Sequence, residues 1–377
     1  MARTEEGAGG RMVIEAAAFA KALAVAAGVT ESRNTIPILA NLCLRAEGET
    51  VEIVSTDLDI EYRHRVPLAA PMEGRLITTI DAKRMAALAG AAAPGAQLSI
   101  EMEGAVRAIV KAGRSRWVLP TLPADDFPLV VASPADARMT VAAPALLAGA
   151  IKRVMWSVST EVTRYYLNGP LFHGDSGKLR LVSTNGNTLM LVGLDIDWPE
   201  GAPEVILGAK FCRLLESLTR AAAAPLTLAW DGRRMVAEMG DVTLTGKVID
   251  GSFPDYRRVI PAQQDAPIVF DPADLVPAIR RVQLISSEKT RSIAINPETG
   301  KLLISATDPG GGTAEEELSA QAEQAFQRGF NGAFVLAAVD ALGGDTVELH
   351  HSDAGAPALF RRSVDDGARC VVMPMRV

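Results

Sequence analysis

The sequence repeats one order of events three times, and this repeat constrains the fold more than any single motif. Each repeat opens with an apolar helical pattern, which a strand, a turn and a second strand follow. A further strand then runs into a second helix. The Ser-Thr or Ala-Thr step after each turn puts Thr56, Thr184 and Thr307 in register, 128 and 123 residues apart. The sequence therefore predicts three similar domains, each large enough for its own core.

Strand patterns and linkers give these domains their expected architecture. The large apolar residues Leu226, Leu228 and Trp230 stand at alternate positions, as in half-buried strands, and Gly or Asp-Gly turns join such segments into hairpins. Segments rich in Pro, Ala and polar residues, SPADAR (133–138) and PAQQDAP (261–267), separate the repeats. We expect an α+β fold with two helices packed on antiparallel sheet in each domain, and domains at 11–137, 138–265 and 266–377.

Composition excludes several classes of protein. With 48% hydrophobic and 22% charged residues, the 377-residue chain is globular in type, and no apolar run is long enough to cross a bilayer. Its N-terminal segment lacks the basic start and apolar core of a signal peptide. The isolated cysteines rule out a disulfide framework and a C-x-x-C motif, and the histidines lack metal-ligand spacing. We expect a cytoplasmic protein with no membrane partner, no metal and no cofactor.

The net charge of -7 argues against a nucleic-acid partner only if the charge is evenly spread. Basic residues recur instead on the expected helices: Lys21, Lys83, Arg84, Lys152, Arg153, Lys210, Arg213, Arg220, Arg280 and Arg281. Such side chains commonly form a solvated face. Their recurrence across the repeats raises the alternative, a surface that follows phosphates without reading bases. Two helices weaken it, because AFVLAAVDALGG of the third repeat has no Lys or Arg and the first helix has only Lys21.

Three motifs imitate catalytic sites. Gly174-Asp175-Ser176-Gly177 has the letters of a serine-protease nucleophile motif, but its position between two strands predicts a hairpin turn. The triple glycine at 310–312 is followed by no helix and no Lys-Ser or Lys-Thr, so a phosphate loop is not expected. His350 and His351 are neighbours in a strand pattern and point to opposite faces. The sequence predicts a binding scaffold with no catalytic residues.

Several segments then become recognisable. SRNTIPILANLCL, VSTDLDIEYR, GRSRWVLPTLPADDFP, TRYYLNG, DGSFPDYRRVIP and VVMPMRV resemble the bacterial DNA polymerase III β sliding clamps, from about Arg11 to Val377. The resemblance implies three domains per chain and a head-to-tail homodimeric ring whose helices surround duplex DNA. It also implies a non-catalytic processivity factor. The implied partners are the polymerase III α subunit, the clamp loader and other proteins with a clamp-binding motif.

The resemblance also carries a set of site residues. Partner peptides would enter an apolar cleft between the second and third domains, at Arg164, Thr184, Gly186, Asn187, Thr188, Leu189, Pro254, Arg258, Val259, Pro357, Val371, Val372, Met373, Pro374, Met375 and Arg376. DNA contacts are expected at Arg33, Tyr165, Tyr166 and Lys210. Ring closure is expected to bring Trp117 of one chain to Leu284 and Ile285 of the other.

One loop of the cleft departs from the family pattern. Where the family usually has Thr-Asp-Gly-His-Arg-Leu, residues 184–189 read Thr-Asn-Gly-Asn-Thr-Leu, which replaces three ionisable side chains by neutral ones. Ala209 also stands where a basic residue is usual. We therefore keep open a specialised clamp paralogue with altered partner or inhibitor binding. A monomeric interaction module without DNA and a hydrolase that uses the Ser176 turn are the remaining alternatives.

Overall fold

A computed structural model describes residues 10–31, 35–130, 135–263, 267–287, 291–322, 327–351, 355–364 and 366–376. The chain divides into two compact units, Met1–Ala145 with Ser217–Val248, and Leu146–Glu216 with Ile249–Val377. Each unit is described by itself.

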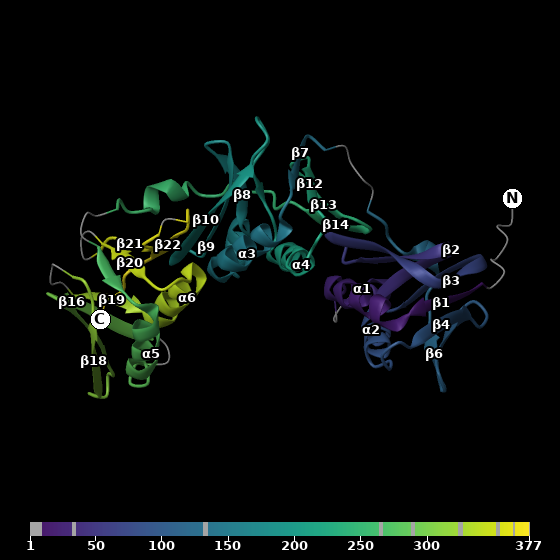
Figure 1. The fold of residues 1–377 in the computed structure, drawn as a ribbon, viewed down its shortest axis with the longest axis horizontal. Helices are drawn as coiled ribbons and strands as arrows, with labels where there is room; N and C mark the ends of the chain where they lie inside the picture. The colour runs from purple at the N-terminus through teal and green to yellow at the C-terminus, as the bar shows by residue number, and fades with distance from the viewer. Residues whose placement is uncertain are drawn as a thin grey trace. The chain divides into compact units, whose positions relative to one another are not determined.

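The same element order occurs three times, as the repeat predicts (Figure 1). The first repeat contains β1 (Arg11–Glu15), α1 (Ala16–Val29), β2 (Asn41–Thr56), β3 (Ile60–Asp81), α2 (Ala82–Gly90), β4 (Gln97–Met102), β5 (Arg107–Ala112) and β6 (Ser115–Pro120). The second contains β7 (Ala137–Val141), α3 (Pro144–Val154), β8 (Leu171–Asp175), β9 (Lys178–Thr184), β10 (Thr188–Asp197), β11 (Val205–Ile206), α4 (Ala209–Thr219), β12 (Leu226–Trp230), β13 (Arg234–Met239) and β14 (Val242–Lys247).

The third repeat contains β15 (Ile268–Phe270), α5 (Pro272–Val282), β16 (Ser292–Glu298), β17 (Lys301–Thr307), β18 (Thr313–Ser319), β19 (Arg328–Asn331), α6 (Gly332–Leu342), β20 (Val347–His350), β21 (Ala358–Arg362) and β22 (Arg369–Val372). Short 3-10 turns add η1 (Pro37–Ala40), η2 (Ala124–Asp126), η3 (Met155–Ser157), η4 (Val162–Leu167) and η5 (Tyr256–Val259). Two helices on antiparallel sheet in each of three similar domains confirm the expected α+β class.

The first unit holds a four-stranded sheet, β1-β4-β5-β6, and a six-stranded sheet, β2-β3-β14-β13-β12-β7. Helix α1 begins where the Glu15 carboxylate accepts a hydrogen bond from the Ala18 amide at 2.7 Å, an N-cap. Its apolar side, including Phe19 and Leu23, is fully buried, and α1 packs beside α2 and against β2 and β3 (Figure 1).

The second unit holds an eight-stranded sheet, β11-β8-β9-β10-β22-β21-β20-β15, and a four-stranded sheet, β18-β17-β16-β19. Strand β10 pairs with β22, which lies about 180 residues further along the chain, and Leu189 stands opposite Val371. In the first unit, β3 pairs with β14 in the same way, with Tyr62 opposite Leu244. Continuous sheets therefore join neighbouring repeats, and the expected domain boundaries stay a prediction.

The local turn predictions are confirmed. Thr56, Thr184 and Thr307 each end a strand, β2, β9 and β17. Ser176 and Gly177 form the two-residue turn between β8 and β9, both with positive φ (52° and 75°), as a type I′ hairpin requires. Residues 308–312 close the β17–β18 hairpin, so the triple glycine belongs to a loop between strands.

Candidate partner-binding cleft

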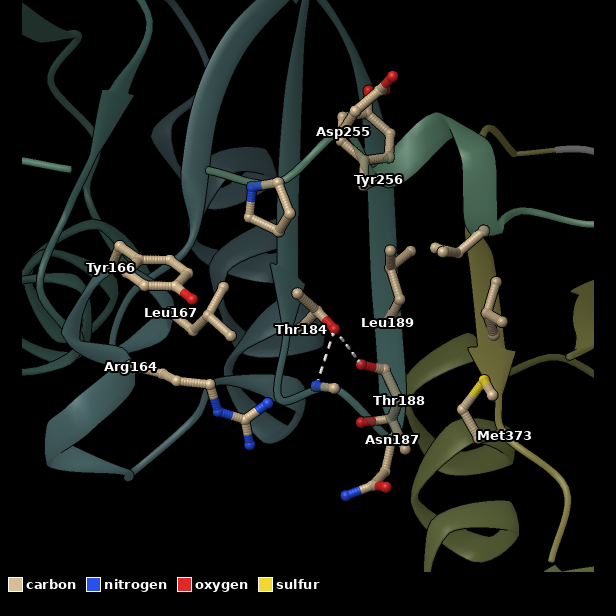
Figure 2. Close-up of a pocket in the computed structure, with 14 residues that line it drawn as sticks. Arg164, Tyr166, Leu167, Thr184, Asn187, Thr188, Leu189, Asp255, Tyr256 and Met373 are labelled. Carbon is tan, nitrogen blue, oxygen red and sulfur yellow. Dashed lines mark hydrogen bonds between the residues drawn. The ribbon is translucent and has the colours of Figure 1, made fainter. Parts of the chain in front are cut away.

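A cavity of about 290 Å³ opens on the second unit at the place where β10 meets β22. Figure 2 shows residues of η4 on one side, the loop after β9 beneath, η5 above and β22 opposite. The lining residues are Arg164, Tyr166, Leu167, Thr184, Gly186, Asn187, Thr188, Leu189, Pro254, Asp255, Tyr256, Val259, Val371 and Met373. Most of these present carbon to the cavity, so it suits apolar side chains.

The buried cluster beneath the cleft fixes its walls. Leu171, Val182, Leu189, Tyr256 and Val371 belong to one hydrophobic core that both repeats supply. The wall formed by β22 is held by backbone as well, because the amide of Met373 donates to the Asn187 carbonyl at 2.8 Å. The cleft is therefore preformed by sheet pairing and core packing.

The loop at 184–188 reproduces a turn of the first repeat. The Thr184 hydroxyl donates to the Thr188 carbonyl at 2.7 Å and accepts from the Gly186 amide at 3.2 Å (Figure 2). Thr56 does the same, donating to the carbonyl four residues on at 2.8 Å and accepting from the amide two residues on at 3.0 Å. The register between the repeats thus extends to individual hydrogen bonds.

The neutral replacement at Asn185 keeps this geometry. Its Oδ1 accepts from the amides of Asn187 and Thr188, both at 2.9 Å. Asp57 of the first repeat uses Oδ1 in the same way, at 3.0 and 2.7 Å. An asparagine thus accepts the same two bonds as an aspartate, although without charge assistance, so the departure from the family pattern changes the charge of the loop and leaves its shape.

Thr188 is turned inward. Its side chain is buried, and its hydroxyl shares a hydrogen bond of 2.8 Å with the Ser157 hydroxyl. Asn187 points the other way and is exposed at the mouth of the cleft (Figure 2). Two residues replace the His and Arg of the family pattern. Thr188 is buried and supports the loop, and Asn187 is a neutral residue at the rim of the cleft.

The side chain of Arg164 also holds this loop by a hydrogen bond. Its Nε donates to Glu161 Oε2 at 2.8 Å, Nη2 donates to the other oxygen of Glu161, and Nη2 also donates to the Asn185 carbonyl at 3.3 Å. Nη1 lies 2.7 Å from where a Cβ on Gly186 would be. The Arg164 side chain could shift away from such a Cβ, but Gly186 also has φ +90°, and this backbone conformation is the reason that the turn favours glycine.

Tyr256, which lines the cleft, is hydrogen-bonded to the buried His173. His173 Nδ1 donates to the Gly174 carbonyl at 3.0 Å, which leaves Nε2 to accept from the Tyr256 hydroxyl, also at 3.0 Å. Burial lowers the pKa of His173 and raises that of Tyr256, so both stay neutral near pH 7. Because both ring nitrogens are engaged, His173 is not available as a base for Ser176, and the hydrolase interpretation gains no support.

Ten of the sixteen cleft residues expected from the sequence line the cavity. The others lie outside its lining: Arg258, Pro357, Val372, Pro374, Met375 and Arg376. Met375 uses its amide to bond the Gly329 carbonyl at 2.9 Å, whereas Met373 is 38% exposed and faces the cavity (Figure 2). Sequence reasoning missed Leu167, Asp255 and Tyr256, although all three fall inside the segments that carry the resemblance.

The residues expected at DNA are spread over several elements. Arg33 lies outside the described residues. Tyr165 is 53% exposed on η4, while Tyr166, which packs edge-on against it, lines the cleft. Lys210 is the second residue of α4 and is half-buried. The contacts of these residues with DNA stay a prediction.

Two basic residues of the expected helical face already have partners within the chain. Arg153 is bonded to Asp366 at 3.0 Å, and Arg281 forms a two-pronged ion pair with Glu316. Lys152 and Arg280 beside them are exposed. The positive charge available to a phosphate backbone is therefore smaller than the sequence alone suggests.

The residues expected at ring closure lie at sheet edges or helix ends. Trp117 is half-buried on β6, which ends one four-stranded sheet. Leu284 and Ile285 follow α5 and are 83% and 38% exposed. Among the described residues, no group of His, Cys, Asp or Glu has the arrangement of a metal site. In the same part of the chain, no helix is long and apolar enough to cross a membrane.

Family models agree with this architecture along nearly the whole chain. The N-terminal, central and C-terminal domains of the DNA polymerase III beta subunit match residues 11–131, 142–255 and 257–376. The beta sliding clamp of Caulobacter vibrioides is 35% identical over 376 residues, covering 97% of this chain and 100% of that protein.

Solved structures agree as well. The Pseudomonas aeruginosa sliding clamp bound to griselimycin superposes with a TM-score of 0.93 at 33% identity, covering 98% of this chain and 100% of that one. The Bartonella birtlesii clamp bound to griselimycin gives a TM-score of 0.93 at 30% identity, with the same coverage.

Three repeats joined through continuous sheets define the class, a three-domain DNA clamp. The chain belongs to the DNA polymerase III beta subunit family, the beta sliding clamps. Proteins of this family are processivity factors that bind DNA, form homodimers and carry no catalytic activity of their own.

Proposed function

We propose that this chain closes with a second copy into a ring around duplex DNA and tethers the replicative polymerase and other proteins through the cleft at β10 and β22. The observation that carries the tethering role is the preformed apolar cavity, whose lining includes the adaptable side chain of Met373. A site of this kind accepts short peptides that differ in detail. A cytoplasmic location follows from this role.

Two sheet edges support ring closure. Strands β6 and β18 each end a four-stranded sheet, and such edges are ready to pair with another chain. Arg114 is exposed beside β6 and Glu315 is exposed on β18, while the exposed Arg116 and Glu317 already pair with Glu103 and Lys301 of the same chain. Opposite charge on the two edges favours contact between β6 of one copy and β18 of the other, and disfavours like pairs.

A labelled Gln-Leu-Ser-Leu-Phe peptide titrated against the protein tests the cleft. We expect micromolar binding that falls at least tenfold in Met373→Ala, because that side chain forms part of the wall. Met12→Ala, a buried methionine of the other unit, is the control for general loss of stability. Equal affinity of the wild type and Met373→Ala would contradict the assignment of this cavity.

The specialised-paralogue alternative rests on one observation, the neutral loop at 185–188. Since Asn185 keeps the hydrogen bonds of the turn, the change acts on charge. A paralogue of this kind would form rings and bind peptides, but would rank partners differently.

A further inference from the structure

The charged groups at the cleft are balanced within the chain. Among the described lining residues, Arg164 and Asp255 carry charge. Asp255 Oδ2 lies 2.8 Å from Arg258 Nε, and Arg164 is held by Glu161. Glu161 itself does not line the cavity, yet it fixes the electrostatic character of the one lining cation.

One of the two guanidinium edges that a carboxylate can use, the Nε–Nη2 edge of Arg164, is already occupied. Glu161 takes Nε and Nη2 of Arg164 with both of its oxygens, the two-pronged arrangement that best fits an arginine. The hydrogen bond from Arg164 lowers the pKa of Glu161, so the carboxylate stays charged at neutral pH. Nη1 lies beside Gly186, so an anion that binds the remaining edge of the guanidinium comes close to the Glu161 carboxylate on the same arginine.

The pair is also open to exchange. The Glu161 side chain is 55% exposed and that of Arg164 is 35% exposed, so a competing anion can reach both from solvent. Exposed ion pairs are individually weak, so the free energy of replacing the Glu161 carboxylate by a peptide carboxylate at Arg164 is close to zero. An acidic peptide residue must either displace Glu161 or lie next to it as a like charge.

We propose that Glu161 is a specificity-determining residue. By pairing with the Arg164 guanidinium, it makes the cleft bind neutral peptide motifs more tightly than motifs that place an acidic residue close to Arg164. This inference rests on the proposed peptide-binding function. The neutral Asn185, Asn187 and Thr188 add no positive charge that would offset the bias. The bias acts through a long-range charge, so it weakens as salt screens it.

The test uses blocked peptides, acetylated at the start and amidated at the end, so that only side-chain charge varies. The neutral Gln-Leu-Ser-Leu-Phe peptide is compared with four others, in which a single Asp or Glu replaces each of the first four residues in turn. Affinities for wild type and Glu161→Gln are measured by fluorescence anisotropy in 50 mM and 500 mM NaCl. Glutamine keeps an oxygen for Arg164 and removes the charge.

Each acidic peptide has a penalty, the factor by which it binds more weakly than the neutral peptide. For at least one of the four acidic peptides, we expect this factor to be about threefold to fivefold smaller in Glu161→Gln than in the wild type at low salt. That change shrinks toward unity at high salt, and the affinity for the neutral peptide stays within twofold. Glu298→Gln removes a carboxylate from another exposed pair three residues apart, with Lys301, and should leave every ratio unchanged.

Two results overturn the inference and are distinguishable. If the peptides bind but every acidic-to-neutral ratio agrees within twofold between wild type and Glu161→Gln, Glu161 does not set specificity, and the proposed function stands. If no peptide binds the wild type, the peptide-binding function fails and the inference fails with it.

Discussion

Arg153 joins the second and third repeats, and its removal tests how the two are held together. Its Nε donates to the Ala341 carbonyl at 2.7 Å and Nη2 donates to the Leu342 carbonyl at 3.2 Å, at the last turn of α6. Nη1 pairs with Asp366 at 3.0 Å. One side chain of α3 thus satisfies two terminal carbonyls of another helix and one carboxylate.

The magnitude follows from these contacts. Hydrogen bonds to charged groups contribute about 1.5–3 kcal/mol each, and three that share one side chain do not add. Both Arg153 and Asp366 are 24% exposed, so water replaces part of what is lost. We expect Arg153→Ala to lower the free energy of unfolding by about 2–3 kcal/mol and Arg153→Lys to restore about 1 kcal/mol.

The assay is urea unfolding, fitted to the transition that involves the second unit, since a chain of several domains need not unfold in one step. Combined with Asp366→Asn, Arg153→Ala should give a coupling energy of about 1 kcal/mol or more. Lys152→Ala, the exposed neighbour, should change stability by less than about 0.5 kcal/mol. A loss below about 0.5 kcal/mol in Arg153→Ala, or strict additivity with Asp366→Asn, would refute the reasoning.

Further outcomes follow from local geometry. Gly169→Ala would put a Cβ 1.9 Å from the Leu207 carbonyl oxygen and should lower the stability by about 3 kcal/mol or more. Gly149→Ala, in a helical position with open space around it, should raise the stability by about 0.5–1 kcal/mol. Changes in melting temperature of the same sign for both variants would contradict this. Burial lowers the pKa values of His64, His173 and His350 below 6.5, so their neutral forms favour the folded state, and melting temperatures should fall as the pH drops from 7.5 to 5.5. A melting temperature that stays flat over this range would count against that assignment. Peptide affinity should be constant between pH 6.5 and 8 in the wild type. In Asn187→His, the affinity for an acidic peptide should rise as the pH falls, because the new imidazole becomes positively charged. Identical pH profiles of the two proteins would exclude a position of residue 187 at the rim of the cleft. A thiol reagent should label Cys43, Cys212 and Cys370 only after denaturation, since all three are buried, and rapid labelling of the folded chain would contradict that burial.

Local sequence signals predicted the repeat unit well. Turn chemistry and strand periodicity act over a few residues, so the strand ends at Thr56, Thr184 and Thr307 and the Ser176-Gly177 turn could be predicted without a structure. The family resemblance supplied ten residues of the cavity lining. Arg164, Pro254, Val259, Val371 and Met373 lie in short matching segments, and the other five lie in the loop at 184–189 that departs from the family pattern.

Long-range pairing could not be predicted in that way. The register that sets Leu189 opposite Val371 depends on two strands about 180 residues apart, and no local pattern specifies it. The same holds for Tyr256 with His173, and for Arg153 with the end of α6. These contacts decide which predicted residues share the cavity and that Arg153 is held within the chain.

The central claim is that this chain acts as a closed ring on DNA, and topology tests it most directly. The protein is loaded by a clamp loader onto a nicked circular plasmid and passed over a sizing column in 0.5 M NaCl, which screens phosphate contacts. We predict that it elutes with the circle as two copies per ring and is released when one restriction cut makes the plasmid linear. Equal release from circular and linear DNA would contradict the account.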